Sequence, residues 1–596
     1  MKISIINQKH NKMKRNILYL LLAFPACASA YDAKVDGIFY DLDESGAIVT
    51  YETTNYDSYS GEVTVPSSIE FEGKTYEVYA VGDHAFDSCK TLERVQLPET
   101  VTTLGSYAFF GCSGMKWVNV PCSVTLAGDY VFQGCKGTCC FDVDQKRGGY
   151  DLGKLFRTNN FTGLEFGENV ETVSGSTFYY TEVHSVKFSA SIREMKEGFW
   201  HVSDLEKVEF ASVESACSIL YGYDGVNPLK YAHHLYIDGK EVKDLVIPEG
   251  VKSISEYAFN GADITSLSIP STLEEMGQMA FSSCSSLARV TVDAANPLYD
   301  SRNGCNAMVR TADNTLVMAC PSTTIPEGIE AIGSYAFFAV KGLSKLEFPS
   351  SVKKLEDFAL YCCTDLKEVV LNKGIESLGN YAFGVCPLSK INFPESLTNI
   401  GNYCFYATGF TDIVVPKTWK KIGANVFSNC LDLITATIEH GVSAIPQSMF
   451  YYCICMEEVS IPSSVTSIGI MAFDGCESLN ELTIPSSVTS IGEMAFNSAE
   501  NIYDYYIYAT TPPEISARTF SYYGAQLHVV EGCGEAYQND PYWGNFSIEE
   551  DLEASVEGIP ADAKGNGTCF DLSGRPLPQK PTKGIYIQNG KKFLGK

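Results

Sequence analysis

Hydrophobic and polar positions recur along this chain with a period of 22 to 24 residues. The clearest copies lie near the end, where residues 465–487 read VTSIGIMAFDGCESLNELTIPSS and the pattern restarts at 488 as VTSIGEMAFNSA, an offset of 23 residues. The phenylalanine of this repeat can be followed backwards, with one leucine in its place, through Phe450, Phe427, Phe405, Phe383, Leu360, Phe337, Phe281, Phe259, Phe132, Phe109 and Phe86. A fixed period of this size is typical of a solenoid, in which each repeat forms one coil.

One copy shows which elements the pattern predicts. Leu92, Val95 and Leu97 are apolar, and the last two alternate with polar residues, as in a strand with one buried face. Pro98 follows and ends the strand, because proline has no N–H to give to a ladder. The later run 106–110, Ser-Tyr-Ala-Phe-Phe, predicts a short helical turn on the opposite side. A single copy cannot bury its apolar face, so the copies must stack around a shared core.

The pattern LxxLxLPxxVxxIGxxAFxxC, taken from VTSIGIMAFDGCESLNELTIP and its relatives, resembles the BspA-like class of leucine-rich repeats of bacterial surface proteins. The resemblance covers roughly 81–530. It implies an α/β repeat solenoid that is right-handed and curved, with a parallel β-sheet along one face and short helical turns or coils opposite. Proline recurs through the repeats, which argues against an array of long amphipathic helices.

Residues 1–30 have the features of a secretion signal. Lys14 and Arg15 precede the apolar run 17–24, and Ala28-Ser29-Ala30 is a small-residue cleavage site that would leave Tyr31 as the new N-terminus. Cys27 keeps lipid attachment open as an alternative. No later segment is long and apolar enough to span a bilayer once the signal is removed. We therefore expect a protein that is secreted, or held at the cell surface in association with the outer membrane.

Composition divides the rest of the chain into segments. Alternating strands in 31–80 predict an antiparallel β cap, because the end of a solenoid is otherwise an unpaired sheet edge. Repeats occupy 81–292, with irregular segments at 138–160 and 211–240, and resume over 326–530. Between them, two apolar runs in 293–325 flank a turn composition, which predicts a β-hairpin that bulges from the solenoid.

Three segments follow the last repeats. Residues 531–547 are expected to form a C-terminal cap in which Tyr537, Trp543 and Phe546 close the core. Residues 548–567 are first acidic and then glycine-rich, a linker composition. Residues 568–596 resemble the short C-terminal sorting domain of secreted proteins of the Bacteroidetes, which implies a role in export or surface attachment.

The cysteines raise the question of disulfides, since the chain has 21 of them and an export signal. Nine share one repeat position, which indicates a stacked, buried small residue, although neighbouring coils would lie within bridging distance: Cys89, Cys112, Cys135, Cys284, Cys363, Cys386, Cys430, Cys453 and Cys476. Cys305 and Cys320 lie outside this ladder. They are the best candidates for a disulfide, because a turn centred between Ala312 and Asp313 would place them opposite each other.

The net charge and the absence of known motifs argue against several classes of function. The formal net charge is −28 at pH 7 without a basic stripe, which argues against nucleic-acid binding. GxSxG, HExxH and phosphate-binding glycine loops do not occur in the sequence. A zinc site is not expected at Cys135, Cys139 and Cys140, because no histidine or fourth cysteine lies nearby to complete the ligand set. The pair His233-His234 is expected to be exposed or packed, and not a metal site. We therefore expect neither an enzyme, nor a cofactor, nor a metal site.

The remaining candidate is the solvent side of the strands, at positions 3 and 5 of each LxxLxL unit. Position 3 is basic or aromatic as far as the middle of the chain and acidic towards the end. The candidate ligand-binding residues are Arg94, Trp117, Arg289, Lys345 and Lys390. Exposed tryptophan and arginine are frequent interface hot spots. The simpler interpretation of these rows is a solvated face of mixed charge.

The sequence thus predicts an exported surface protein that works by binding. The resemblance implies adhesion to host extracellular proteins or to proteins on other bacteria. A glycan-binding protein is the first alternative, because exposed aromatic side chains, including some of the 35 tyrosines, would suit sugars. A structural surface spacer without a specific ligand is the second.

Overall fold

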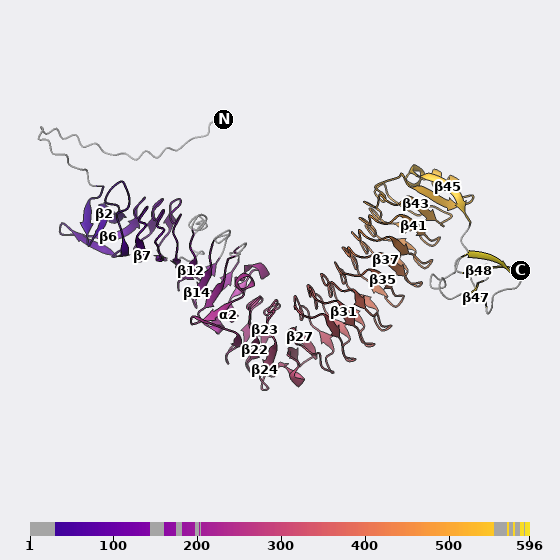
Figure 1. Ribbon diagram of the computed structural model, residues 1–596, viewed down its shortest axis with the longest axis horizontal. Helices are drawn as coiled ribbons and strands as arrows, with labels where there is room; N and C mark the ends of the chain where they lie inside the picture. Colours follow the sequence, from indigo (N-terminus) through magenta and orange to yellow (C-terminus); the bar gives the residue numbers. More distant parts are fainter. Residues whose placement is uncertain are drawn as a thin grey trace, which may run out of the picture.

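The structure is a computed structural model that describes residues 30–142, 160–173, 182–196, 202, 204–553 and four strands between 569 and 595. The chain forms one arc-shaped solenoid, whose two arms meet near β24 (Arg289–Val292) and β27 (Thr315–Ala319) (Figure 1). The predicted signal segment, apart from Ala30, lies outside the described residues, as do most of the predicted linker and parts of 568–596. Among the described residues, no helix is long and apolar enough to cross a membrane.

The N-terminal cap is antiparallel, as expected. It contains β1 (Ala33–Val35), β2 (Ile38–Leu42), β3 (Ala47–Thr50), β4 (Gly61–Thr64), β5 (Ser68–Phe71) and β6 (Lys74–Val81). β1 pairs with β2, β2 with β3, and β5 with β6, all antiparallel. The two-residue turn Asp36-Gly37 has positive φ at both residues, the geometry that tight hairpins need. β3 and β6 then pair in parallel, which starts the ladder of the solenoid.

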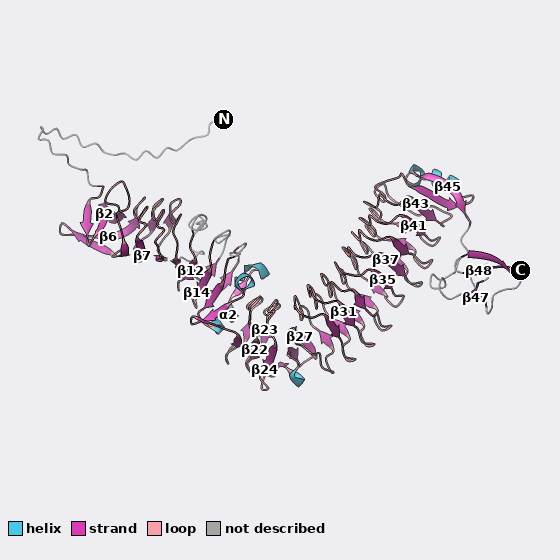
Figure 2. Ribbon diagram, viewed as in Figure 1, coloured by secondary structure: helices cyan, strands magenta, loops and turns pink. Residues whose placement is uncertain are grey.

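The first strand of each repeat builds the predicted parallel sheet, whose solvent side we call the strand face (Figure 2). In the N-terminal arm these strands are β7 (Leu92–Gln96), β9 (Trp117–Val120), β11 (Thr138–Phe141), β12 (Gly163–Phe166), β14 (Ser185–Phe188), β16 (Lys207–Phe210), β18 (Leu235–Ile237), β20 (Asp244–Val246), β22 (Ser266–Ile269) and β24. The short β19 (Lys240–Glu241) pairs antiparallel with β18. In the C-terminal arm they are β29 (Lys345–Glu347), β31 (Glu368–Val370), β33 (Lys390–Ile391), β35 (Asp412–Val415), β37 (Thr435–Ile438), β39 (Glu458–Ser460), β41 (Glu481–Ile484), β43 (Asp504–Ile507), β44 (Gln526–Val530) and β45 (Ser547–Leu552).

A second row of short strands follows the turn after each first strand. They are β8 (Thr103–Leu104), β10 (Leu126–Ala127), β13 (Thr172–Val173), β15 (Glu194–Met195), β17 (Leu220–Tyr221), β21 (Ser253–Ile254), β23 (Glu275–Met276), β28 (Ala331–Ile332), β30 (Lys354–Leu355), β32 (Ser377–Leu378), β34 (Asn399–Ile400), β36 (Lys421–Ile422), β38 (Ala444–Ile445), β40 (Ser467–Ile468) and β42 (Ser490–Ile491). Gly105 follows one of these strands. Only glycine fits there, because a Cβ would lie 2.4 Å from the backbone nitrogen of Asp83 in the preceding coil.

The third side of each coil is a turn, where the sequence predicted a short helical turn. In residues 107–111 the N–H groups of Tyr107, Phe109 and Gly111 donate to carbonyls of the next coil, at Asp129, Val131 and Gln133. Tyr107 has a φ of 58°, and the residue before each Ala-Phe pair repeats this conformation. Because alternate N–H groups bond to the next coil, these segments form a third ladder, which we call the turn ladder.

True helices are few in the described residues and lie in inserts and caps (Figure 2). They are α2 (Val213–Ser218), α3 (Leu229–Ala232) and α4 (Gly534–Gln538), with the 3-10 helices η2 (Asp224–Val226), η3 (Arg302–Gly304) and η4 (Trp543–Asn545). At the C-terminal end Tyr537, Trp543 and Phe546 are buried over the last coils. The indole N–H of Trp543 donates to the carbonyl of Pro513, and the Tyr537 hydroxyl donates to that of Ala509. The last described strands, β46 (Cys569–Phe570), β47 (Pro576–Leu577), β48 (Gly584–Gln588) and β49 (Lys591–Gly595), form a separate antiparallel sheet.

The hairpin between the arms is part of the core, so the prediction that it bulges outwards is wrong. It consists of β25 (Tyr299–Asp300), β26 (Ala307–Arg310) and β27. Met308 and Met318 pack into the core of the N-terminal arm, whereas Val309 and Leu316 pack into that of the C-terminal arm. Because apolar side chains lie on both faces of the hairpin, it is held between the two cores, at the bend of the arc (Figure 1).

Candidate ligand-binding face

The five predicted binding residues lie on the strand face but do not form one site. Arg94 and Trp117 are on β7 and β9, Arg289 is on β24, and Lys345 and Lys390 are on β29 and β33. Neighbouring strands are ~4.8 Å apart, so Arg94 and Arg289 are separated by roughly 40 Å along the solenoid. A ligand that contacts several of these residues must therefore be large.

Arg94 and Trp117 form a single structural unit. They are direct neighbours in the parallel register, and the Arg94 guanidinium lies 3.7 Å from the centroid of the Trp117 ring. Trp117 is thus half-buried, with one ring face covered, and the fully exposed indole expected from the sequence is not found. The cation–π contact restricts the conformations of both side chains.

Lys345 and Lys390 are engaged within the chain. Lys345 contacts Glu347 at 2.7 Å and Glu368 at 3.3 Å, and Lys390 contacts Glu368 at 3.2 Å. Hydrogen bonds to the two glutamates raise the pKa of Lys345, and those from the two lysines lower the pKa of Glu368. Such exposed ion pairs add little stability, but they leave less free positive charge for a partner. Among the described residues Arg289 is exposed and makes no ion pair.

The strand face also contains charged residues that the sequence analysis missed. In the N-terminal arm Glu209 contacts Lys207 at 2.8 Å and Lys187 at 3.3 Å, and the Lys207 ammonium lies 4.5 Å from the ring centroid of Tyr236. These residues lie where the repeat motif degrades. The 22-residue spacing of their strands, which continues through Gly163, Ser185 and Lys207, is the signal that could have located them.

Charge is segregated along this face. After Lys390, positions 3 and 5 of the described strands contain no lysine or arginine, and their acidic residues are Asp412, Glu458, Glu481, Asp504 and Glu549. The one basic group there is His528 on β44. Its Nε2 lies 3.2 Å from Asp504 and its Nδ1 lies 2.8 Å from Asp551, while its ring stacks on Tyr506.

The pKa of His528 is raised. Burial alone would lower it, but the hydrogen bonds and charges of Asp551 and Asp504 outweigh the burial. The spacing of position 3 continues beyond β41 through Asp504 and Gln526. Position 5 of the last of these strands is His528, so the repeat spacing is the signal that leads to this group.

The stacked cysteines act as buried hydrogen-bond donors. Every cysteine from Cys89 to Cys533 is a free thiol. The Cys112 thiol donates to the carbonyl of Phe86 at 2.9 Å, and most ladder cysteines repeat this contact with the phenylalanine 25 or 26 residues earlier. Burial raises the pKa of Cys89 to about 12 and that of Cys430 to about 11, so these thiols are poor nucleophiles.

Cys305 and Cys320 are not bridged in the structure, and they do not face each other. Near the turn the register is the predicted one, with Arg310 opposite Thr315. A β-bulge then shifts the pairing by one residue, so that Ala307 lies opposite Ala319. The Cys320 thiol consequently donates to the carbonyl of Asn306, whereas the Cys305 thiol contacts that of Ala307.

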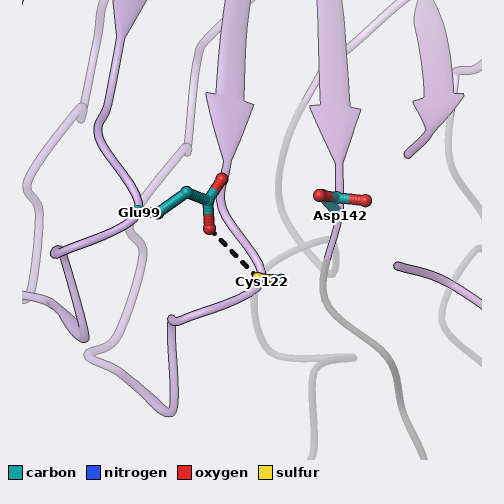
Figure 3. A group of neighbouring side chains, drawn as sticks. All are labelled: Glu99, Cys122 and Asp142. Carbon is teal, nitrogen blue, oxygen red and sulfur yellow. Dashed lines mark hydrogen bonds between the residues drawn. The ribbon is translucent and has the colours of Figure 1, made fainter. Parts of the chain in front are cut away.

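Within the described part of the chain, three groups of side chains bring metal-ligand atoms together. In the first, shown in Figure 3, the Cys122 thiol lies 3.1 Å from Glu99, while Asp142 already accepts two hydrogen bonds from Asn169. In the second, Lys243 supplies the positive charge between Glu241 and Asp263, beside His234. The third contains His528 with Glu549 and Asp551. Each group has three candidate ligands, one fewer than the four of a structural zinc site.

Comparisons with known proteins place the repeats in a family. The family described as "BspA type Leucine rich repeat region (6 copies)" matches residues 79–206, 234–301, 318–434 and 443–530, which is more than half of the chain. No curated protein matches the chain.

Several solved structures resemble it. A leucine-rich repeat protein from Bacteroides ovatus is 19% identical, covering 88% of this chain and 100% of that one, with a TM-score of 0.36. A leucine rich cell surface protein from Faecalibacterium prausnitzii is 20% identical over 80% and 94% of the two chains, with a TM-score of 0.25. The pneumococcal vaccine antigen PcpA is 16% identical over 88% and 98%, with a TM-score of 0.30. On the strength of the repeat match over most of its length, this chain belongs to the BspA-type leucine-rich repeat family.

Proposed function

We propose that this chain is an exported cell-surface protein of the adhesin type, which binds an acidic region of a host or bacterial protein through the strand face of its N-terminal arm. The observation that carries this proposal is the Arg94–Trp117 unit, a held pair of hot-spot residues on an otherwise regular sheet. Arg289, exposed on the same face, supplies a second positive anchor.

The solenoid supports such a function physically. Each coil adds a few polar side chains to one continuous face, so many small contacts sum over a large area. Up to Lys390 the described face mixes lysine, arginine and aromatic residues with glutamates such as Glu209 and Glu368, whereas after Lys390 its carboxylates have no lysine or arginine beside them. This difference in charge gives a partner a preferred orientation. Binding, with no catalytic step, is the activity that this arrangement favours.

The glycan-binding alternative has less support. Sugars stack on the open faces of aromatic rings, but the row formed by Tyr335, Phe358, Tyr381 and Tyr403 on the turn side is stacked ring on ring, at centroid distances of 4.5 to 5.0 Å. Its ring faces are therefore largely covered by one another, and only the edges remain for a ligand. A spacer without a ligand would not need the Arg94–Trp117 unit.

The test is binding of the purified chain to immobilised extracellular-matrix proteins and, in parallel, to polysaccharides, at low and at physiological salt. We expect saturable binding to an acidic protein that weakens as salt rises, because exposed charges are screened. Binding to polysaccharides alone would favour the glycan alternative, and binding to nothing in either set would favour the spacer.

A further inference from the structure

The turn ladder is interrupted at the bend of the arc. Two coils before the break, Tyr257, Phe259 and Gly261 donate their N–H groups to the carbonyls of Gln278, Ala280 and Ser282 in the last coil before it. The same contacts recur through the C-terminal arm, for example from Tyr335, Phe337 and Ala339. At the break, the hairpin with β26 and β27 takes the place of a normal coil.

Three backbone donors are consequently left without acceptors. Met279, Phe281 and Ser283 occupy the ladder positions of the coil before the break, and Met279 and Ser283 have the φ values of their counterparts, 56° and 59°. Their N–H groups make no hydrogen bond within the described structure. Unpaired N–H groups at partly buried positions are rare in native proteins and call for a partner.

The opposite side of the break offers acceptors. In the coil that follows, Ser334, Ala336 and Phe338 occupy the positions whose carbonyls accept in the next coils of the C-terminal arm, for example at Asp357, Ala359 and Tyr361. Only the Ala336 carbonyl is used, by the N–H of Ala319 at the end of β27. The carbonyls of Ser334 and Phe338 accept no hydrogen bond from the preceding side in the described residues.

These two sets of groups line one cleft of about 230 Å³. One wall is the turn 276–284, the floor is β27 with Val317 and Met318, and the other wall is the turn 333–340. Two charged side chains also border it, and both are engaged: Arg310 with Asp313, and Glu356 with Lys354 and Ser334.

The arrangement of donors selects the ligand. In the regular coils, N–H groups two residues apart each donate to a separate carbonyl of the next coil. The three free N–H groups are therefore spaced to bind the carbonyls of a main chain better than a single carboxylate or phosphate. An anion could also not donate to Ser334 and Phe338, whereas alternate peptide units of an extended main chain direct their carbonyls to one side and their N–H groups to the other.

We propose that the cleft at the bend binds a short peptide segment with small side chains, whose main chain takes the place of the missing rung by accepting from Met279, Phe281 and Ser283. This inference rests on the proposed function, since it assumes that the partner is a protein, and it identifies a second contact at which that partner, through a loop or chain end, would be held. The strand face and the cleft can be tested separately.

Hydrogen–deuterium exchange of the full chain tests the cleft directly. Without peptide, the amides of Met279, Phe281 and Ser283 should exchange at least ~10-fold faster than those of Tyr257, Phe259 and Gly261, because only the latter are hydrogen-bonded. Adding the uncharged probe acetyl-Ser-Ala-Gly-Ala-Gly-amide at millimolar concentration should slow the 279–283 segment by on the order of tenfold.

Val317→Phe, which fills the cleft, should abolish this protection, while Val414→Phe on the exposed strand face should leave it intact. Acetate is the anion control. Protection by acetate but not by the peptide would overturn the main-chain assignment, and no protection by either, or equal protection in Val317→Phe, would overturn the site. Those results would leave partner binding through Arg94 and Arg289 untouched, so the two proposals fail separately.

Discussion

The cysteine ladder can be tested at Cys453, which is fully buried in the C-terminal arm. Its thiol donates to the carbonyl of Phe427 at 3.2 Å. Cys453→Ala removes the hydrogen bond and the sulfur atom, whereas Cys453→Ser keeps a donor at the same place. Comparing the two variants therefore separates the hydrogen bond from simple filling of space.

The expected magnitudes follow from these contacts. Loss of a sulfur-sized apolar group costs about 0.8 kcal/mol, loss of a buried hydrogen bond about 1 kcal/mol, and the residual cavity adds a few tenths. Cys453→Ala should therefore lower the free energy of unfolding by about 2 kcal/mol, and Cys453→Ser by about 1 kcal/mol. Cys455, two residues later and exposed, provides a control whose replacement by alanine should change it by less than about 0.5 kcal/mol.

Urea unfolding followed by circular dichroism measures these differences as shifts of the midpoint, with the slope of the transition checked for each variant, because solenoids can unfold in parts. The opposite result is that Cys453→Ser destabilises the chain as much as Cys453→Ala does. That result would mean that the thiol fills space and that its hydrogen bond contributes nothing.

Three further predictions address the thiols, the terminal histidine and the C-terminal cap. A thiol reagent should label Cys455 rapidly in the native chain and the ladder cysteines only after unfolding; rapid labelling of many thiols would contradict their burial. Folding raises the pKa of His528, so its contacts should stabilise the chain most at low pH. The wild type should therefore be more stable than His528→Gln at low pH, and this difference should fall as the pH rises through the folded pKa, which lies above 6.5. A difference between the two unfolding midpoints that stays constant from pH 5 to 9 would exclude this effect. Trp543→Ala should cost about 3 to 5 kcal/mol and loosen the last coils first, as seen by hydrogen exchange; uniform loosening of both arms would argue against a local cap.

The stacking of the coils could be predicted because the core residues recur at the same position of each repeat. Phe450 lies between Phe427 and Phe473, at centroid distances of 5.8 and 5.5 Å, as its 23-residue spacing indicated. The alternation in β7 likewise identified Leu92 and Val95 as buried and Arg94 as directed to solvent. Such features depend on residues that are periodic along the chain.

Features that depend on the backbone or on a single irregularity could not be predicted. The β-bulge next to Val309 separates Cys305 from Cys320, and hydrophobicity gives no sign of it. The turn ladder uses main-chain N–H groups, so its interruption at Met279 leaves no mark in the residue pattern. The cation–π contact of Arg94 with Trp117 depends on the side-chain conformations, although the repeat spacing already makes the two residues neighbours in the register of β7 and β9.

The claim that the strand face binds an acidic protein is tested most directly by charge reversal. Arg94→Glu/Arg289→Glu is compared with the wild type and with Lys252→Glu/Tyr130→Ala, which changes an exposed cation and an exposed aromatic residue away from the strand face. Surface binding is measured against the protein partner found in the matrix panel. We predict that the strand-face variant loses at least ~10-fold in affinity, mostly at low salt, while the control binds like the wild type. Equal binding by all three chains would contradict the account.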